Sequence, residues 1–251
     1  MLYNKKPEMI LFDVGGTLFD DGKCNFREGL GALRKYALNP DVTDDDKLFS
    51  LCSDFMRETG SDYLSLSGAK LDMPLSAMLK YVTMNAGLHF DKSMYQLEEL
   101  FDRFNSTRKL LDGITELLLL LKKLGIRTAV ISNNAMSGES LSLAIKRWLP
   151  EAEFEFCLTS ADILFAKPYK LIFETALKFA GTEAESCWYC GDSFVPDVCG
   201  SSGVGMSPVL IDKNSETPLC LQDDGKGEYM TVNSWRALSE YLINAFGKDI
   251  L

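Results

Sequence analysis

The stretch MILFDVGGTLFDD, residues 9–21, places four apolar residues in front of Asp13 and two glycines shortly after it. A short apolar run that ends at a turn signal predicts a buried strand. Glycine allows backbone conformations that other residues avoid, so Gly15 and Gly16 favour a sharp turn at this point. The stretch therefore predicts a strand over Met9–Phe12 that presents the Asp13 carboxylate at its carboxyl end.

The chain from about residue 110 onward alternates between helical and strand patterns. Helices are predicted at 114–124, 138–148, 169–180 and from about 234, and strands at 127–132, 154–158, 186–190, 209–211 and just before the last helix. Strands that alternate with helices favour a doubly wound parallel sheet, whose ligand site lies beyond the carboxyl ends of the strands. We therefore expect an α/β fold with a Rossmann-like core, and the opening strand belongs to its sheet.

The segment from residue 23 to 106 has a different pattern, with no convincing strand. Helical periodicity predicts four helices, at 26–38, 44–58, 74–86 and 92–104, and the glycines and serines of 59–68 indicate a loop. We therefore predict two domains: a catalytic core formed by residues 1–22 and 107–251, and an all-helical cap formed by residues 23–106.

Composition and charge exclude several classes of function. Acids outnumber bases 36 to 26 in the 251 residues, for a net charge of −10, which argues against a nucleic-acid partner. No apolar run approaches the roughly 20 residues of a membrane span, and we expect neither a membrane partner nor an export signal. The seven cysteines predict no disulfide framework, which favours the reducing cytoplasm.

Two features of the composition bear on catalysis. The spacing of Cys187 and Cys190 permits redox chemistry or half of a zinc site, but no second such pair exists, and we favour small thiols in a buried strand. His89 is the single histidine, so a triad or a site of several histidines has no residue to spare. We expect His89 on the surface or in the cap.

Polar residues gather at the predicted carboxyl ends of the strands. They are Asp13, the Ser132-Asn133-Asn134 run, Gly191-Asp192-Ser193 with Asp197, and Lys167 just ahead of a helix. A carboxylate can attack phosphorus when a cation suppresses the repulsion between two anions, and Mg²⁺ prefers oxygen ligands. A hydroxyl and an ammonium would stabilise the charge on the phosphoryl oxygens. The set favours phosphoryl transfer through an aspartyl intermediate.

Four motifs occur in order along the chain: ILFDVGGTL (10–18), VISNN (130–134), AKPYKLIFE (166–174) and YCGDSFVPD (189–197). With them the sequence resembles the haloacid dehalogenase superfamily of hydrolases. The resemblance implies a Rossmann-like core with a helical cap inserted between the first and second motifs. It also implies Mg²⁺ as cofactor and a small phosphorylated metabolite as substrate.

The resemblance also implies a role for individual residues. Asp13 would be the nucleophile and a metal ligand, with the Gly15 carbonyl and Asp192 as further ligands. Ser132, Lys167, the Asn133 amide and Gly16 would surround the phosphoryl group. Thr17 would stabilise the turn after the nucleophile, and Asp197 would hold its loop or a metal-bound water.

The sequence departs from the phosphatase pattern of this family at Gly15. Phosphatases of the family usually carry an aspartate there, which protonates the leaving oxygen and later activates water, and glycine transfers no proton. The resemblance therefore leaves open an acyl-phosphate or phosphonate substrate, the latter with a cap lysine such as Lys47, Lys70 or Lys80, and a catalytically weak phosphate-binding regulatory module. Asp20 or Asp21 is a further candidate acid. The metal-type carboxylate Asp192 argues against the metal-free dehalogenase branch.

The sequence leaves the identity of the substrate, the cap residues that select it and the oligomeric state open.

Overall fold

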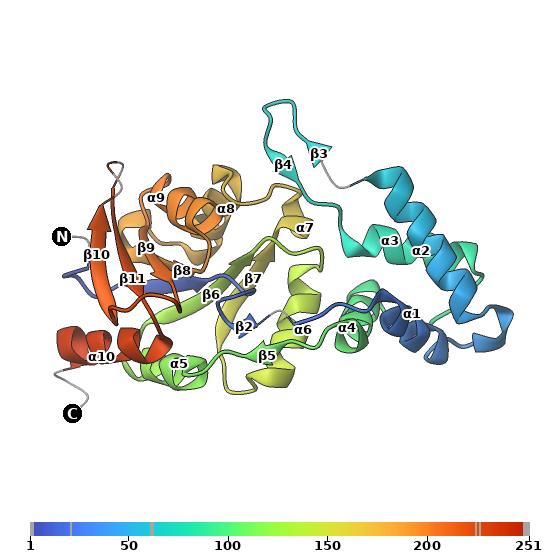
Figure 1. Ribbon diagram of the computed structural model, residues 1–251, viewed down its shortest axis with the longest axis horizontal. Helices are drawn as coiled ribbons and strands as arrows, with labels where there is room; N and C mark the ends of the chain where they lie inside the picture. The colour runs from blue at the N-terminus through green and yellow to red at the C-terminus, as the bar shows by residue number, and fades with distance from the viewer. Residues whose placement is uncertain (1–2, 21, 61–62, 224, 226, 248–251) are drawn as a thin grey trace.

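The core of the computed structural model is a seven-stranded sheet in the order β10-β11-β9-β8-β1-β6-β7 (Figure 1). The structure describes residues 3–20, 22–60, 63–223, 225 and 227–247. The strands are β1 (Met9–Phe12), β6 (Arg127–Ser132), β7 (Phe154–Thr159), β8 (Cys187–Gly191), β9 (Ser207–Ile211), β10 (Leu219–Asp223) and β11 (Glu228–Val232). Their order reverses at β1, which pairs in parallel with β6 on one side and β8 on the other. In a doubly wound fold this reversal marks the ligand crevice.

The parallel sheet predicted from the sequence is confirmed for six of these strands. Strand β10 is an addition that the sequence analysis missed, and it runs antiparallel to β11 at the edge of the sheet. A short connection between two neighbouring strands permits only antiparallel pairing, because a parallel return needs a crossover of a dozen or more residues. The sheet is therefore mixed, with one antiparallel edge.

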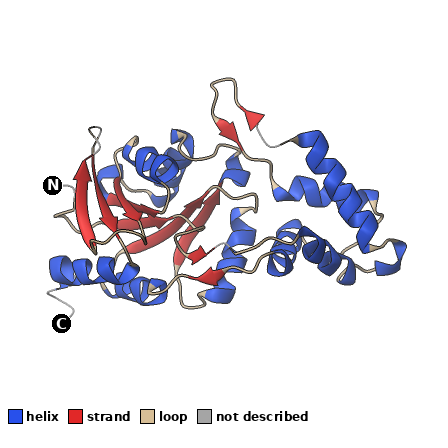
Figure 2. Ribbon diagram, in the orientation of Figure 1, coloured by secondary structure: helices blue, strands red, loops and turns tan. Residues whose placement is uncertain are grey.

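The side chains of β1 alternate between two hydrophobic cores, and all four are buried. Ile10 and Phe12 join the core under α5 (Ile114–Lys123), α6 (Gly138–Trp148) and α10 (Trp235–Phe246). Met9 and Leu11 join the core under α8 (Lys170–Ala180) on the opposite face. Helices cover both faces of the sheet (Figure 2). Because a strand buried on both faces has no polar side, its sequence is a continuous apolar run.

The cap contains the four predicted helices, α1 (Phe26–Lys35), α2 (Asp45–Thr59), α3 (Leu75–Asn85) and α4 (Met94–Asn105). It is not all helical, because a two-stranded antiparallel hairpin, β3 (Tyr63–Leu64) and β4 (Lys70–Leu71), stands where the sequence predicted a loop. Gly68 allows the turn with a φ of 78°, and its amide donates to the Ser65 carbonyl. The hairpin was missed because strands of two residues show no periodicity.

The first helix of the cap is shorter than predicted. Helix α1 ends at Lys35 instead of Leu38, and a 3₁₀ turn (η1, Pro40–Val42) follows. The prediction ran three residues too far, because Tyr36 leaves the helical conformation, with φ −95° and ψ 2°, and forms the C-cap.

Two segments connect the cap to the core, and the two domains also pack against each other. The connections pair as β2 (Phe19–Asp20) and β5 (Lys109–Leu110). The hydrophobic core of the cap includes Met136 and Ala144 from the core domain. Helix α4 also places the buried Glu98 against the start of α6, where it accepts hydrogen bonds from the Ser137 amide and hydroxyl.

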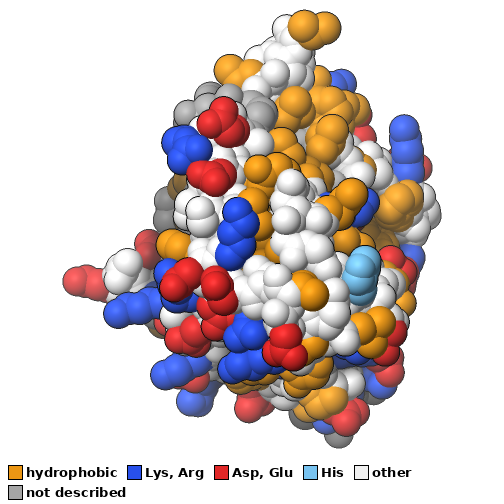
Figure 3. Space-filling view, turned by 90° about the vertical axis from the view of Figure 1, so that its right-hand side faces the viewer, with side chains coloured by type: hydrophobic (Ala, Val, Ile, Leu, Met, Phe, Trp, Pro, Cys, Tyr) orange, Lys and Arg blue, Asp and Glu red, His pale blue; other side chains and the backbone are white. Residues whose placement is uncertain are grey.

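The outer end of the cap exposes many hydrophobic side chains, among them Met56, Leu66 and Met84. The space-filling view of this end shows hydrophobic groups next to one another, and the single histidine lies there on the surface (Figure 3). His89 is exposed, as the sequence analysis expected. Within the described residues, no helix is long and apolar enough to span a membrane.

Candidate active site

A cavity of about 270 Å³ opens at the carboxyl edge of the sheet. Its walls come from the core domain alone: Asp13, Gly15, Ser132, Asn133, Asn134, Lys167, Asp192, Ser193, Pro196 and Asp197. The structure thus brings together most of the residues that the sequence placed at the strand ends. Asp20 and the cap lysines Lys47, Lys70 and Lys80 are not among the lining residues, and Asp21 lies outside the described part of the chain.

Asp13 continues the backbone ladder of β1, since its amide donates to the Cys190 carbonyl at 2.9 Å. The chain then turns through Gly16, whose φ is 65°. A Cβ at Gly16 would stand 2.0 Å from Asp192 Oδ2, so glycine is required by space as well as by backbone angle. The turn therefore allows the Asp192 carboxylate to approach the loop after Asp13.

Thr17 follows this turn and is fully buried. Its amide donates to the Val14 carbonyl, and its own carbonyl accepts from the indole of Trp235 at 2.9 Å. Its hydroxyl has no hydrogen-bond partner among the described residues. The backbone of Thr17, held by the C-terminal helix α10, thus fixes the turn.

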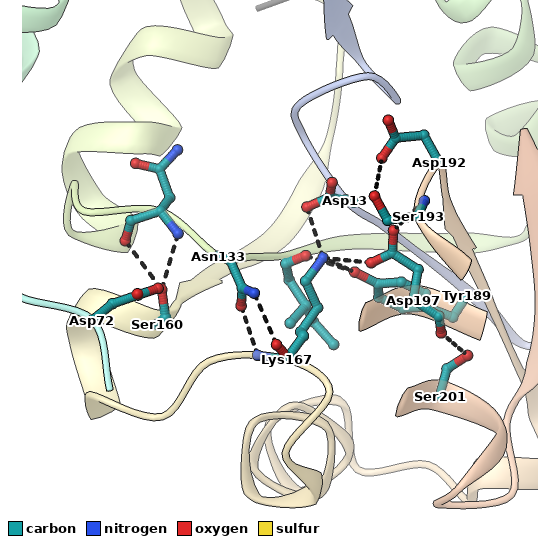
Figure 4. A network of polar contacts seen from close by, with 12 residues as sticks. Asp13, Asp72, Asn133, Ser160, Lys167, Tyr189, Asp192, Ser193, Asp197 and Ser201 are labelled. Atoms are coloured by element: carbon teal, nitrogen blue, oxygen red, sulfur yellow. Dashed lines mark hydrogen bonds and ion pairs between the residues drawn. The ribbon is translucent and has the colours of Figure 1, made fainter. Parts of the chain in front are cut away.

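Lys167 is the centre of the polar network (Figure 4). Its ammonium donates to Asp13 Oδ1 at 2.8 Å, to Asp197 Oδ1 at 2.7 Å and to the Tyr189 hydroxyl at 2.8 Å. Burial disfavours the charged ammonium, but the two carboxylates outweigh burial and raise the pKa of Lys167. Three hydrogen bonds satisfy every donor of an ammonium, so the group is both charged and fixed.

Asp197 is buried behind Lys167, and both of its carboxylate oxygens are engaged. Oδ1 accepts from Lys167 and Oδ2 accepts from the Ser193 amide at 2.9 Å. A Cβ on Gly191 would stand 2.3 Å from Asp197 Cγ, so only glycine permits this close approach. Burial raises the pKa of Asp197, although the Lys167 ammonium opposes the rise.

Asp13, Asp192 and Asp197 each place a carboxylate oxygen within 4.8 Å of the other two. Burial, followed by the negative charge of Asp13, raises the pKa of Asp192. Like charges gathered this closely indicate a place for a cation, and a set of carboxylate oxygens suits Mg²⁺. The donor set therefore fits a magnesium ion, with Asp192 exposed to the solvent side.

Ser132 ends β6 and Asn133 follows it, and both line the cavity. Ser132 is buried, and the cap of helix α6 is Ser137 rather than Ser132. The Asn133 side chain forms a two-bond clamp on the backbone of Lys167, accepting from its amide at 2.6 Å and donating to its carbonyl at 3.0 Å. The sequence analysis expected only a backbone amide from Asn133 and missed this clamp.

Tyr189 is a second residue that the sequence analysis did not assign to the site. Its hydroxyl accepts from Lys167 and donates to the Ile131 carbonyl at 2.8 Å. Burial raises the pKa of Tyr189 well above its usual value, so the hydroxyl keeps its proton. The only signal in the sequence was its position two residues before Gly191 in the apolar strand β8.

The cysteine pair of β8 takes no part in this network. Cys187 and Cys190 are buried and free, and all seven cysteines of the chain are free. Burial raises the pKa of the Cys187 thiol to about 11. The structure therefore supports the interpretation of the pair as apolar packing within a strand.

Comparison with known proteins shows which family of proteins this chain is similar to. The model of the haloacid dehalogenase-like hydrolase family matches residues 10–211. A glyceraldehyde 3-phosphate phosphatase from Methanothermobacter thermautotrophicus is 28% identical over 225 residues, which cover 82% of this chain and 85% of that protein. Haloacid dehalogenase-like hydrolase domain-containing protein 3 from Xenopus laevis is 33% identical over 127 residues, about half of each protein.

Solved structures show the same fold at lower sequence identity. A 2-haloacid dehalogenase from Pseudomonas syringae aligns with a TM-score of 0.58 at 20% identity, covering 95% of this chain and 99% of that one. A putative hydrolase from Bacillus subtilis, solved with bound magnesium and described as showing interdomain movement, aligns with a TM-score of 0.52 at 18% identity, covering 95% and 99%.

Proposed function

The chain belongs to the haloacid dehalogenase-like hydrolase family, and on that premise we propose that it is an Mg²⁺-dependent enzyme that forms an aspartyl-phosphate on Asp13. The observation that carries this proposal is the contact of Asp13 with the Lys167 ammonium, with Asp192 and Asp197 within 4.8 Å. The relative named as a phosphatase of glyceraldehyde 3-phosphate supports a small phosphorylated metabolite as substrate.

The first step is an attack of the Asp13 carboxylate on phosphorus. Because Oδ1 accepts from Lys167, we assign the attack to Oδ2. A bond forms between this oxygen and phosphorus, and the bond from phosphorus to the leaving oxygen breaks. The Lys167 ammonium and the Ser132 hydroxyl stabilise the negative charge that gathers on the phosphoryl oxygens.

Asp13, the Gly15 carbonyl and Asp192 would hold Mg²⁺. The ion, when bound, would reduce the repulsion between the carboxylate and the phosphoryl group. Asp197 is only 2% exposed and is the least accessible of the three carboxylates, so we assign it to positioning instead of metal binding. Gly16 lets the loop pass beside the phosphoryl group, and the Asn133 amide completes its binding.

Gly15 limits the class of substrate. No proton donor stands at this position, and among the described residues no cap side chain lines the cavity. General acid catalysis contributes roughly 10²–10⁴-fold, and leaving groups of low basicity depend on it least. We therefore propose acyl phosphates and other substrates with good leaving groups ahead of alkyl phosphate esters.

Two alternatives have weaker support. A phosphonate-cleaving reaction would need a lysine at the cavity to form an imine, but Lys47, Lys70 and Lys80 do not line it. A regulatory module that binds phosphate without turnover needs only the network around Lys167.

The reducing cytoplasm remains our prediction for the location of the protein, and the seven free cysteines are compatible with it.

A substrate panel tests the proposal. Purified protein is assayed with acetyl phosphate, para-nitrophenyl phosphate, glyceraldehyde 3-phosphate, phosphonoacetaldehyde and 2-chloropropionate, each with and without Mg²⁺. We expect turnover of acetyl phosphate that requires Mg²⁺ and disappears in Asp13→Asn. Turnover of 2-chloropropionate alone would overturn the proposal, and binding of phosphate without any turnover would favour the regulatory module.

A further inference from the structure

The strand β4 of the cap forms a short antiparallel pairing with the core segment Leu164–Ala166. The Asp72 amide donates to the Leu164 carbonyl at 2.9 Å, and the Ala166 amide donates to the Lys70 carbonyl at 3.1 Å. Leu71 and Phe165 form the bridge between these two bonds. The next residue in the core segment is Lys167, so the pairing ends one residue before the lysine whose ammonium contacts Asp13.

The backbone of this core segment is held in an unfavourable conformation. Leu164 has a φ of 68°, and it is the one non-glycine residue with positive φ in the part of the chain that the structure describes. A left-handed conformation at a leucine costs free energy and persists only when neighbouring contacts impose it. Its carbonyl is bonded to the cap by the Asp72 amide, so the cap contributes to holding this conformation.

The side chain of Asp72 is connected through Ser160 to the loop at the end of β6, residues 132–134 (Figure 4). Asp72 Oδ2 accepts from the Ser160 hydroxyl at 2.6 Å, and Ser160 Oγ accepts from the Asn134 amide at 2.9 Å. Ser160 is fully buried, so these bonds exchange little with water. A chain in which one hydroxyl both accepts and donates polarises each bond and strengthens the next.

Asp72 contacts the Leu164–Lys167 loop directly and reaches the Ser132–Asn134 loop through Ser160. These two loops are themselves joined by Asn133, whose side chain clamps the backbone of Lys167. The cap makes a further contact just after the 132–134 loop, since the Leu75 amide at the start of α3 donates to the Ala135 carbonyl at 2.7 Å. A single cap segment of six residues therefore holds both loops, on either side of the clamp.

We propose that Asp72 is a positioning residue, which transmits the position of the cap to Ser132, Asn133 and Lys167. Asp72 is not among the residues that line the cavity. Its backbone sets the Lys167 loop and its carboxylate sets the Ser132 loop, so the phosphoryl-binding groups are in register only when the cap segment is docked. The effect on turnover rests on the function proposed above, whereas the effect on the two loops does not.

The test combines amide hydrogen exchange with kinetics in Asp72→Ala, Asp72→Asn and Ser160→Ala. Loss of the carboxylate should speed exchange of the Asn134 amide about tenfold or more in Asp72→Ala, whereas the Ala166 amide keeps its bond to the Lys70 carbonyl and should change less. Asp72→Asn keeps an acceptor for Ser160 and should restore most of the protection. With acetyl phosphate, kcat should fall about tenfold in Asp72→Ala and recover in Asp72→Asn.

The control is Asp91→Ala, which removes an exposed cap carboxylate that pairs with Lys92. The double variant Asp72→Ala with Ser160→Ala should be no worse than either single one, because both break the same chain. Unchanged exchange at Asn134 in Asp72→Ala, or fully additive losses in the double variant, would overturn the inference. Faster exchange in a protein that turns over no substrate would support the positioning role and contradict the proposed function.

Discussion

The Lys167 ammonium donates a hydrogen bond to Asp13 Oδ1 at 2.8 Å across 154 residues of sequence. The exposed fraction is 2% for the lysine side chain and 13% for the aspartate side chain. The pair is therefore shielded on the lysine side and open to the cavity on the aspartate side. This asymmetry holds the Asp13 carboxylate in one orientation while leaving it accessible from the cavity.

Replacement of Lys167 should destabilise the protein strongly. In Lys167→Met the buried Asp197 carboxylate loses its partner, and removal of one member of a buried pair costs about 3–5 kcal/mol. The free energy of unfolding in urea should fall by this amount, and Lys167→Met with Asp197→Asn should recover part of it. Lys170→Met is the control, because its ion pair with Glu174 is exposed and contributes about 0–1 kcal/mol. Equal effects in the two single variants would contradict the buried pair.

Gly191→Ala should displace Asp197 without unfolding the core. The new Cβ would overlap Asp197 Cγ, which it would approach to 2.3 Å, so the carboxylate must move away from Lys167. We expect turnover of acetyl phosphate to fall at least tenfold, because positioned charge supplies much of the catalysis. Gly31→Ala in α1, whose new Cβ would lie 3.3 Å from Asp45, serves as control and should keep full activity. A fully active Gly191→Ala protein would show that the position of Asp197 is unimportant.

Gly15→Asp should raise activity on alkyl phosphate esters. A carboxyl group at this position can protonate the leaving oxygen, and such catalysis contributes roughly 10²–10⁴-fold. The leaving group of acetyl phosphate needs no such help, so its kcat/KM, which reports the steps up to formation of the aspartyl-phosphate, should change little. The measurement is kcat/KM for glyceraldehyde 3-phosphate and acetyl phosphate in both proteins. A folded variant with an unchanged or lower rate on the ester would refute our account of Gly15.

Binding of Mg²⁺ should weaken as the pH falls. Burial and the charge of Asp13 raise the pKa of Asp192 above its ordinary value of 3.8, and protonation removes a metal ligand. Because protons and the metal compete for the same carboxylate, the affinity should increase with pH until Asp192 is ionised, and then level off. Titration calorimetry between pH 4 and 7 measures this, with Asp223→Asn, remote on β10, as a control that keeps the same profile. An affinity independent of pH over this range would count against Asp192 as a ligand.

Alkylation should distinguish the cysteines. Cys24 is exposed, whereas burial raises the pKa of Cys52 and of Cys187 to about 11. Since the thiolate is the reactive form, iodoacetamide at pH 8 should modify Cys24 far faster than the two buried thiols. Mass spectrometry of timed digests gives the rates. Rapid modification of Cys187 in the folded protein would revive a redox role for the pair in β8.

The helices and strands of the parallel sheet could be predicted because their signals are local. The apolar run before Asp13 and the alternation of helix and strand after residue 110 depend only on neighbouring residues. Strand β10 and the hairpin of β3 and β4 could not be predicted, since short edge strands carry little periodicity. The same limit applies to the end of α1, where helix boundaries depend on the segment that follows.

Some residues of the candidate site could be predicted from the sequence and others could not. The motifs identified Asp13, Ser132, Lys167 and Asp192, and the structure places all four on one cavity. The partners of these residues were not predicted. The apolar pattern around Tyr189 indicates a core residue in a buried strand. Only the register of β8 against β1 places its hydroxyl beside Lys167.

The sequence by itself determined that a carboxylate ends a buried strand and that the chain turns sharply after it, because apolar periodicity and glycine act within a few residues. Only the tertiary structure decided which groups meet there. The Asn133 clamp on Lys167 and the reach of Asp72 to Ser160 join segments that are far apart in the chain. Such contacts depend on strand register, on the docking of the cap and on the length of each side chain, and these quantities are fixed only when the whole chain has folded.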